Sequence, residues 1–308
     1  MTGFNSVEPW IWITVFAAFF QNLRSALQKQ ASKDLTVLGA AYVRFAFALP
    51  FAIIYLLVII KFNNNPFPEN SLKFFTYCFL GGLCQIVFTV LLISLFTRRN
   101  FAVGTVYSKT EVIQVAIFGY LILGDKLNFL SSLAVCLCVL GVVALAVKDN
   151  KIKLSSFWSE ARGESSLIGI ACGAFLGVSV VFYRGAALSL NYEGQVYVSA
   201  GYTLTIALVI QTIFMGLLIF FREKPTLKNI FTHWKNSMAV GITAVMASIC
   251  WFTAFTMQSA ALVRALGQIE LIFTFIFSHF LFREKTTFLE MVGITLIMSA
   301  VIVLMLGA

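Results

Sequence analysis

Residues 108–130 read SKTEVIQVAIFGYLILGDKLNFL, and residues 267–289 read GQIELIFTFIFSHFLFREKTTFL. Both stretches belong to one gapless alignment, in which residues 102–147 match residues 261–306 at an offset of 159 and 11 of 46 positions are identical. The alignment superposes Glu111 on Glu270, the two carboxylates in the middle of apolar runs. A repeat of this length indicates a duplicated structural unit.

The composition is that of a membrane protein. The chain is 60% hydrophobic and only 11% charged, and its mean hydropathy is +0.91. A soluble fold of 308 residues needs more polar groups to cover its surface. All six cysteines fall in apolar runs, so they predict neither a disulfide framework nor a zinc site, and we expect no cofactor. The net charge of +9 is dispersed over loops, which argues against a nucleic-acid partner.

Ten apolar runs reach the roughly 20 residues that a helix needs to cross about 30 Å of hydrocarbon. We therefore predict an all-α integral membrane fold of ten transmembrane helices, with a kink at Pro50. The predicted spans lie near residues 10–30, 37–60, 72–97, 101–123, 128–147, 166–189, 195–221, 236–259, 261–282 and 288–307.

The spans divide into two sets of five. Residues 1–147 form the first predicted five-helix repeat, residues 148–165 a linker loop, and residues 166–308 the second repeat. A unit with an odd number of spans enters the membrane from opposite sides, so the repeats are predicted to be inverted, as in many secondary transporters. The loops after odd-numbered spans hold fourteen lysines and arginines against three after even-numbered spans, which predicts termini outside the cytoplasm.

The matched glutamates are the first candidates for function. Each lies about ten residues into its span, roughly 13 Å deep at 1.5 Å per residue. Ionisable residues at such depth are costly and often functional. On one interpretation Glu111 and Glu270 bind a substrate ammonium group or take up a proton. On the other, each is tied to a cation and only fixes helix packing. Candidate cations are Arg24, Arg44, Lys109, Arg184 and Arg264.

Geometry on an ideal helix ranks these cations. Arg264 lies three residues into its predicted span, which favours a boundary role. Lys109 is about 200° around the helix from Glu111, so the two are not expected to pair. Arg44 is deeper, and structural pairing and carboxylate binding are equally open for it.

Polar neighbours extend the candidate site. Tyr107 and Gln114 share a helix face with Glu111, Gln268 adjoins the face of Glu270, and Gln85 and Trp251 lie in the third span of each half. A stripe of Gly169, Gly173 and Gly177 predicts close helix packing against the other half. The predicted substrate-binding or coupling residues are Glu111, Glu270, Tyr107, Gln114, Gln85, Trp251, Gln268 and Arg44.

Short motifs resemble those of the drug/metabolite transporter superfamily, specifically its EamA-type carriers. The motifs are Leu123-Gly124-Asp125-Lys126-Leu127, Phe282-Arg283-Glu284-Lys285-Thr286 and Arg44-Phe45. The resemblance implies a carrier of the cell inner (plasma) membrane that moves a small metabolite by alternating access through a central cavity. It also implies cytoplasmic termini, in conflict with the charge pattern. Many members of this superfamily have proline where Glu111 and Glu270 stand, so we expect a charge here in place of a helix break.

Two functional hypotheses follow. The first is a secondary carrier of a small polar metabolite, amino acids above all, because acidic and basic groups at one depth suit a zwitterion. The alternative is a proton-coupled exporter of cationic drugs. An enzyme is disfavoured because the chain has no His-rich box, and ATP-driven transport is disfavoured because it has no phosphate-binding glycine loop. The predicted partners are a small-molecule substrate and the lipid bilayer, with both a monomer and a homodimer open.

Overall fold

The computed structural model describes residues 8–63, 66–69, 71–96, 108–149, 163–190, 195–273 and 288–307. Tyr107, one of the predicted site residues, lies outside these ranges. Within them all regular structure is helical. The helices are α1 (Pro9–Ala31), α2 (Val37–Ala46), α3 (Leu49–Asn63), α4 (Leu72–Phe96), α6 (Glu111–Leu123), α7 (Phe129–Asp149), α9 (Glu164–Ser189), α10 (Val196–Arg222), α11 (Lys224–Thr232), α12 (Trp234–Met257), α13 (Ala260–Gly267) and α15 (Phe288–Gly307).

Five helical stretches in the described residues are long and apolar enough to cross a membrane. They are Val37–Phe62, Leu72–Leu95, Ser166–Ser189, Val196–Arg222 and Trp234–Met257. Three shorter apolar helices cover Glu111–Leu123, Phe129–Ala144 and Met291–Leu304. Helices suit a bilayer because they satisfy their backbone hydrogen bonds internally. The described residues therefore establish a multi-pass helical membrane protein, while the prediction of ten spans is not confirmed by them.

The second predicted span is bent, as expected from its proline. Helix α2 ends at Ala46, and α3 begins at Leu49 with Pro50 in its first turn, where a missing N–H costs nothing. The loop predicted after residue 221 contains an additional helix, α11. This helix also has a proline, Pro225, in its first turn, and Thr226 and Ile230 form its buried side.

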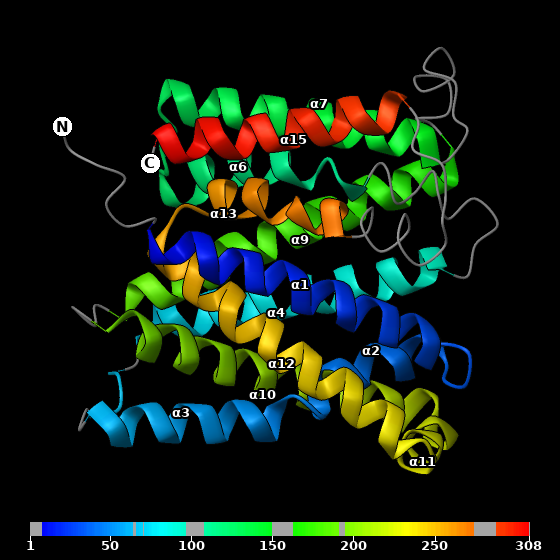
Figure 1. The fold of residues 1–308 in the computed structure, drawn as a ribbon. Coiled ribbons are helices and arrows are strands. Elements are labelled where there is room, and N and C mark those ends of the chain that lie inside the picture. Colours follow the sequence, from blue (N-terminus) through cyan, green and yellow to red (C-terminus); the bar gives the residue numbers. More distant parts are fainter. Residues whose placement is uncertain are drawn as a thin grey trace.

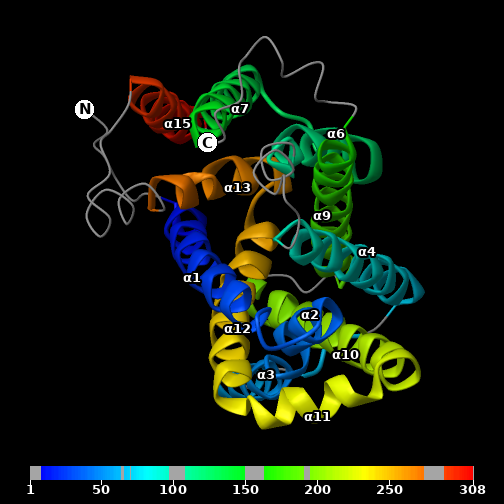
Figure 2. The ribbon, with the colours of Figure 1, turned by 90° about the vertical axis from the view of Figure 1, so that its right-hand side faces the viewer.

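The main helix–helix contacts are equivalent in the two halves of the chain. The most extensive contacts join α4 to α9, α7 to α15 and α1 to α12. In the two halves α1 corresponds to α9, α4 to α12 and α7 to α15. The contact of α1 with α12 therefore corresponds to that of α9 with α4, and α7 and α15 are corresponding helices in contact with each other. Figure 2 shows α1 beside α12 on one flank and α4 beside α9 on the other. Helix α1 begins and α15 ends at the same end of the bundle (Figure 1).

Glycines on α9 permit its close contact with α6. A Cβ on Gly173 would lie 2.9 Å from the Ser108 carbonyl oxygen and 3.2 Å from the Glu111 backbone nitrogen. A Cβ on Gly177 would lie 3.3 Å from the Val115 side chain. These contacts confirm the predicted packing of the small-residue stripe against the other half.

A turn lies just before each matched glutamate, which corrects our expectation of a charge in place of a helix break. Residues 109 and 110 form a turn, and α6 begins only at Glu111. In the second half α13 ends at Gly267, and Gln268 forms the equivalent turn before the chain becomes helical again at residue 269. Proline is therefore not needed for the break. Lys109 and Gln268 themselves lie in these turns.

Candidate functional site

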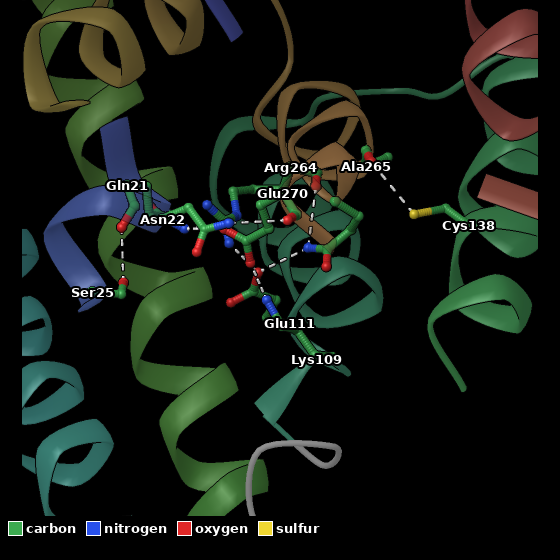
Figure 3. A network of polar contacts seen from close by, with 10 residues as sticks. Gln21, Asn22, Ser25, Lys109, Glu111, Cys138, Arg264, Ala265 and Glu270 are labelled. Carbon is green, nitrogen blue, oxygen red and sulfur yellow. Dashed lines mark hydrogen bonds and ion pairs between the residues drawn. The ribbon is translucent and has the colours of Figure 1, made fainter. Parts of the chain in front are cut away.

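Two ion pairs, one buried and one partly buried, connect the halves of the molecule. Arg264 of α13 pairs with Glu111 of α6, and Lys109, in the turn before α6, pairs with Glu270. Figure 3 shows these four side chains converging between the helices. Glu111 is 4% and Glu270 9% exposed, so water solvates neither carboxylate well. Because breaking such a pair leaves an uncompensated buried charge, each cation is coupled to its partner.

Amide side chains complete the coordination of both carboxylates. Gln268 Nε2 donates to Glu111 Oε1 at 3.1 Å, and Gln21 Nε2 of α1 donates to Glu270 Oε2 at 2.7 Å. Gln268 and Lys109 occupy matched positions at the offset of 159. Each of them therefore reaches from its own helix interruption to the glutamate of the other half. A pseudo-twofold axis between the halves would produce these crossed contacts.

Trp251 of α12 covers the Arg264 guanidinium. The guanidinium carbon lies 4.7 Å from the indole centroid, and the indole stacks on Phe255 with centroids 5.4 Å apart. Gly267 is needed for this arrangement because a Cβ there would lie 2.4 Å from the indole ring. A cation over an aromatic face is stabilised by the ring quadrupole, most strongly where water is excluded.

A second polar cluster lies between α4, α9 and α10. Gln211 Nε2 donates to Gln85 Oε1 at 2.7 Å and lies 2.9 Å from the Tyr183 hydroxyl, which in turn donates to Gln85 Oε1 at 3.1 Å. One helical turn away, Arg44 Nη1 of α2 donates to Thr89 Oγ1 at 3.0 Å. The Arg44 guanidinium also lies 6.0 Å from the centroid of the Phe88 ring.

Arg24 of α1 lies between the two clusters. It shares a face of α1 with Gln21, which contacts Glu270, and with Gln28, which donates to the Ala40 carbonyl oxygen of α2. Glu270 attracts Arg24 electrostatically, and Arg24 in turn acts on Arg44. Arg24 therefore lies on the side of α1 whose neighbouring amides contact Glu270 and α2.

The predicted site residues divide between these clusters. Glu111, Glu270, Gln268 and Trp251 come together in the first, while Gln85 and Arg44 lie in the second. Gln114 is separate, because its amide donates to Thr110 Oγ1 and to the Ile170 carbonyl oxygen of α9.

One expectation about the cations was wrong, and two polar residues were missed. Arg264 is a direct partner of Glu111 instead of a boundary residue, because α13 packs against α6. Lys109, as expected, avoids Glu111 but pairs with Glu270. The sequence reasoning gave no role to Gln21 and Gln211, although each is an isolated amide within an apolar run, which is the signal that could have identified them.

A helical membrane protein built from two matched halves with buried charges between them has the architecture of many secondary transporters. The EamA-like transporter family model matches residues 8–147 and again residues 165–306. The chain belongs to this family, within the drug/metabolite transporter superfamily.

A solved structure supports the same architecture. One structure, titled only "Crystal structure of protein", superposes with a TM-score of 0.67 at 14% sequence identity, and the match covers 97% of this chain and 96% of that chain. At this identity the likeness concerns the fold alone. No curated protein matches the sequence.

Proposed function

We propose that this protein is a secondary active transporter of a small polar metabolite, amino acids above all, which works by alternating access. In this proposal ten spans form two inverted five-helix repeats, residues 1–147 and 166–308, joined by a linker at 148–165. The matched contacts of α1 with α12 and of α9 with α4 support a pseudo-twofold relation between the halves. Carriers of this kind bind substrate between repeats, where helices are interrupted.

The observation that carries the proposal is the crossed pair of ion pairs at the two helix interruptions. Each links a cation of one half to a glutamate of the other, so relative motion of the halves must lengthen or exchange these contacts. A substrate with charged groups can replace part of the lost interaction. Differential contacts of this sort are what allow a ligand to shift a conformational equilibrium.

An amphoteric substrate suits the charges in the site. Its ammonium group would interact with Glu111 or Glu270, and its carboxylate with the arginines nearby. A lipophilic cation, like the ammonium group, would have to displace Lys109 or Arg264 from a glutamate, but it carries no carboxylate for the arginines. The mixture of buried charges therefore favours the first function.

The location and orientation of the protein belong to the same proposal. We place it in the cell inner (plasma) membrane. The excess of lysine and arginine after odd-numbered spans supports cytoplasmic odd loops. Proteolysis of tagged termini in sealed, right-side-out vesicles tests this orientation.

Counterflow in proteoliposomes tests the function. Vesicles containing the full chain are loaded with an unlabelled amino-acid mixture, and uptake of labelled amino acids is followed for the wild type and for Glu111→Gln and Glu270→Gln. Uptake is expected to fall about tenfold or more in both variants. Glu69→Gln is the matched control because Glu69 is exposed.

Stability must be separated from transport in that experiment. The double variant Glu111→Gln/Arg264→Met removes both charges of one ion pair, so neither member is left buried without its partner. If it folds and transports like the wild type, the role proposed for this pair is refuted. Growth in lipophilic cations adds an independent check, because resistance conferred by the protein would favour the drug-exporter alternative.

A further inference from the structure

The buried charges of the described core do not balance. Arg24, Arg44, Arg264 and Glu111 are all at most 6% exposed, and Lys109 and Glu270 lie beside them. Four cations thus face two carboxylates. Glu111 and Glu270 are already engaged by Arg264 and Lys109, so the surplus positive charge is that of Arg24 and Arg44.

Among the described residues, Arg24 is buried with fewer hydrogen-bond partners than Arg44. Its side chain is buried, with the residue 3% exposed, and its Nε is enclosed without a hydrogen-bond partner. Among the residues that the structure describes, none accepts a hydrogen bond from this guanidinium, although Glu270 attracts it from a distance. A guanidinium has five N–H donors, and an uncompensated charge in a membrane protein interior is expensive.

Among the described residues, the hydrogen-bond and ring contacts of Arg44 are with neutral groups. Its Nη1 donates to the Thr89 hydroxyl, and the rings of Phe45 and Phe88 lie 5.4 and 6.0 Å from its guanidinium carbon. Arg24 and Arg44 also repel each other, which raises the cost of holding both in place. An anion between the two would remove the repulsion and satisfy the free donors at once.

From this surplus we infer that Arg24 and Arg44 form an anion-binding site, and that the substrate is an organic anion with a carboxylate or phosphate group in excess of its ammonium groups. Arg24 and Arg44 would hold that group through charge-assisted hydrogen bonds, which are about twice as strong as neutral ones. Gln85, Tyr183 and Gln211 lie within the adjoining cluster, where their amides and hydroxyl can hydrogen-bond the polar remainder of the substrate.

This inference rests on the proposed transport function and narrows its substrate class. Amino acids of similar size but different charge separate the two claims. Glutamate carries a net charge of about −1 at neutral pH, glutamine about 0 and lysine about +1. Phosphoserine distinguishes a phosphate from a second carboxylate.

The test measures thermal stability of the purified full chain and counterflow in proteoliposomes with these four probes. Glutamate, phosphoserine or both are expected to raise the melting temperature and to be transported, because a ligand that binds only the folded state stabilises it. Glutamine and lysine are expected to bind about tenfold or more weakly. Equal effects of glutamine and glutamate, or no effect of either anion, would overturn the anion site.

Variants distinguish a ligand-binding role from a structural one. Arg24→Met and Arg44→Met should each weaken glutamate or phosphoserine binding about tenfold or more. Without ligand, Arg24→Met should melt at or above the wild-type temperature, since it removes an unpaired buried charge. Arg264→Met is the control, because it removes a paired arginine and should melt lower. A lower melting temperature for Arg24→Met with unchanged anion binding would assign Arg24 to structure and refute the inference.

The outcomes also separate the two proposals. Counterflow of glutamine without preference for either anion would leave the carrier function intact and refute the anion site. Stabilisation by glutamate or phosphoserine without counterflow of any probe would support the site and refute the carrier function.

Discussion

The two halves of the chain keep the surroundings of one matched pair of charged residues and not of another. Glu111 and Glu270 have equivalent contacts, since each pairs with a cation of the opposite half. Arg24 and Arg184, which correspond at an offset of 160, do not. Arg184 donates to Asp125 Oδ2 at 3.1 Å and to the carbonyl oxygens of Phe255 and Gln258 at 2.6 Å, where it neutralises the C-terminal end of α12.

Arg24 has no such contacts among the described residues. The difference teaches that one duplicated residue can serve as a structural clamp in one half and remain available for a ligand in the other. The asymmetry extends to Arg44, because α10, the counterpart of its span, has its one basic residue, Arg222, at its C-terminal end. Among the described residues, the buried arginines without an acidic partner, Arg24 and Arg44, thus both lie in the first half.

The largest expected effect comes from breaking a buried ion pair. Arg264→Met leaves Glu111 buried without its cation and should destabilise the protein by about 3–5 kcal/mol. Unfolding in detergent by denaturant measures this change. Glu111→Gln/Arg264→Met should be destabilised by less than the sum of its single variants, as expected for residues in contact. Strict additivity would show that the two side chains are not coupled.

Arg184 should be the next most sensitive position. Arg184→Met removes the ion pair with Asp125 and leaves two carbonyl oxygens without a donor, so we expect a loss of about 2–3 kcal/mol. Arg24→Met, its matched partner, should lose nothing. Similar losses in both variants, in the same unfolding assay, would remove the distinction between the two arginines.

Gly82 and Gly241, which also correspond at the offset of 159, test how far helix packing has diverged between the halves. A Cβ on Gly241 would lie 2.4 Å from Phe47 Cβ and 2.7 Å from its backbone carbon, whereas a Cβ on Gly82 meets nothing closer than 3.5 Å. Gly241→Ala should therefore cost about 1–3 kcal/mol through overpacking. Gly82→Ala should be neutral or stabilising by up to about 1 kcal/mol, because alanine favours helix. The melting temperatures of the two variants should move in opposite directions or differ clearly.

The smallest expected effect belongs to the second polar cluster. Tyr183→Phe removes the hydroxyl shared by Gln85 and Gln211 but keeps the ring, whose centroid lies 4.7 Å from that of Phe252. We expect the free energy of unfolding to fall by about 0.5–1.5 kcal/mol, the net contribution of a hydrogen bond to stability. If Tyr183→Phe instead lowered transport at unchanged stability, the cluster would act on the substrate and not only on packing.

Much of the architecture could be predicted from local sequence. Apolar runs predicted the helices, Pro50 the bend between α2 and α3, and the glycines of α9 its close contact with α6. Other features depended on the context of the chain. The interruptions at Lys109 and Gln268 have no proline or paired glycines to mark them, and α11 lies in a segment too short and too polar to read as a span.

The sequence by itself determined that the protein is a helical membrane transporter built from a duplicated unit, because hydropathy and the repeat are properties of the chain read in order. It also identified the two glutamates. Only the tertiary structure decided which charges meet: Arg264 with Glu111, Lys109 with Glu270, and Arg24 with no acceptor among the described residues. These contacts join residues more than 150 positions apart, and side chains at such separations are brought together by helix packing, which local periodicity does not encode.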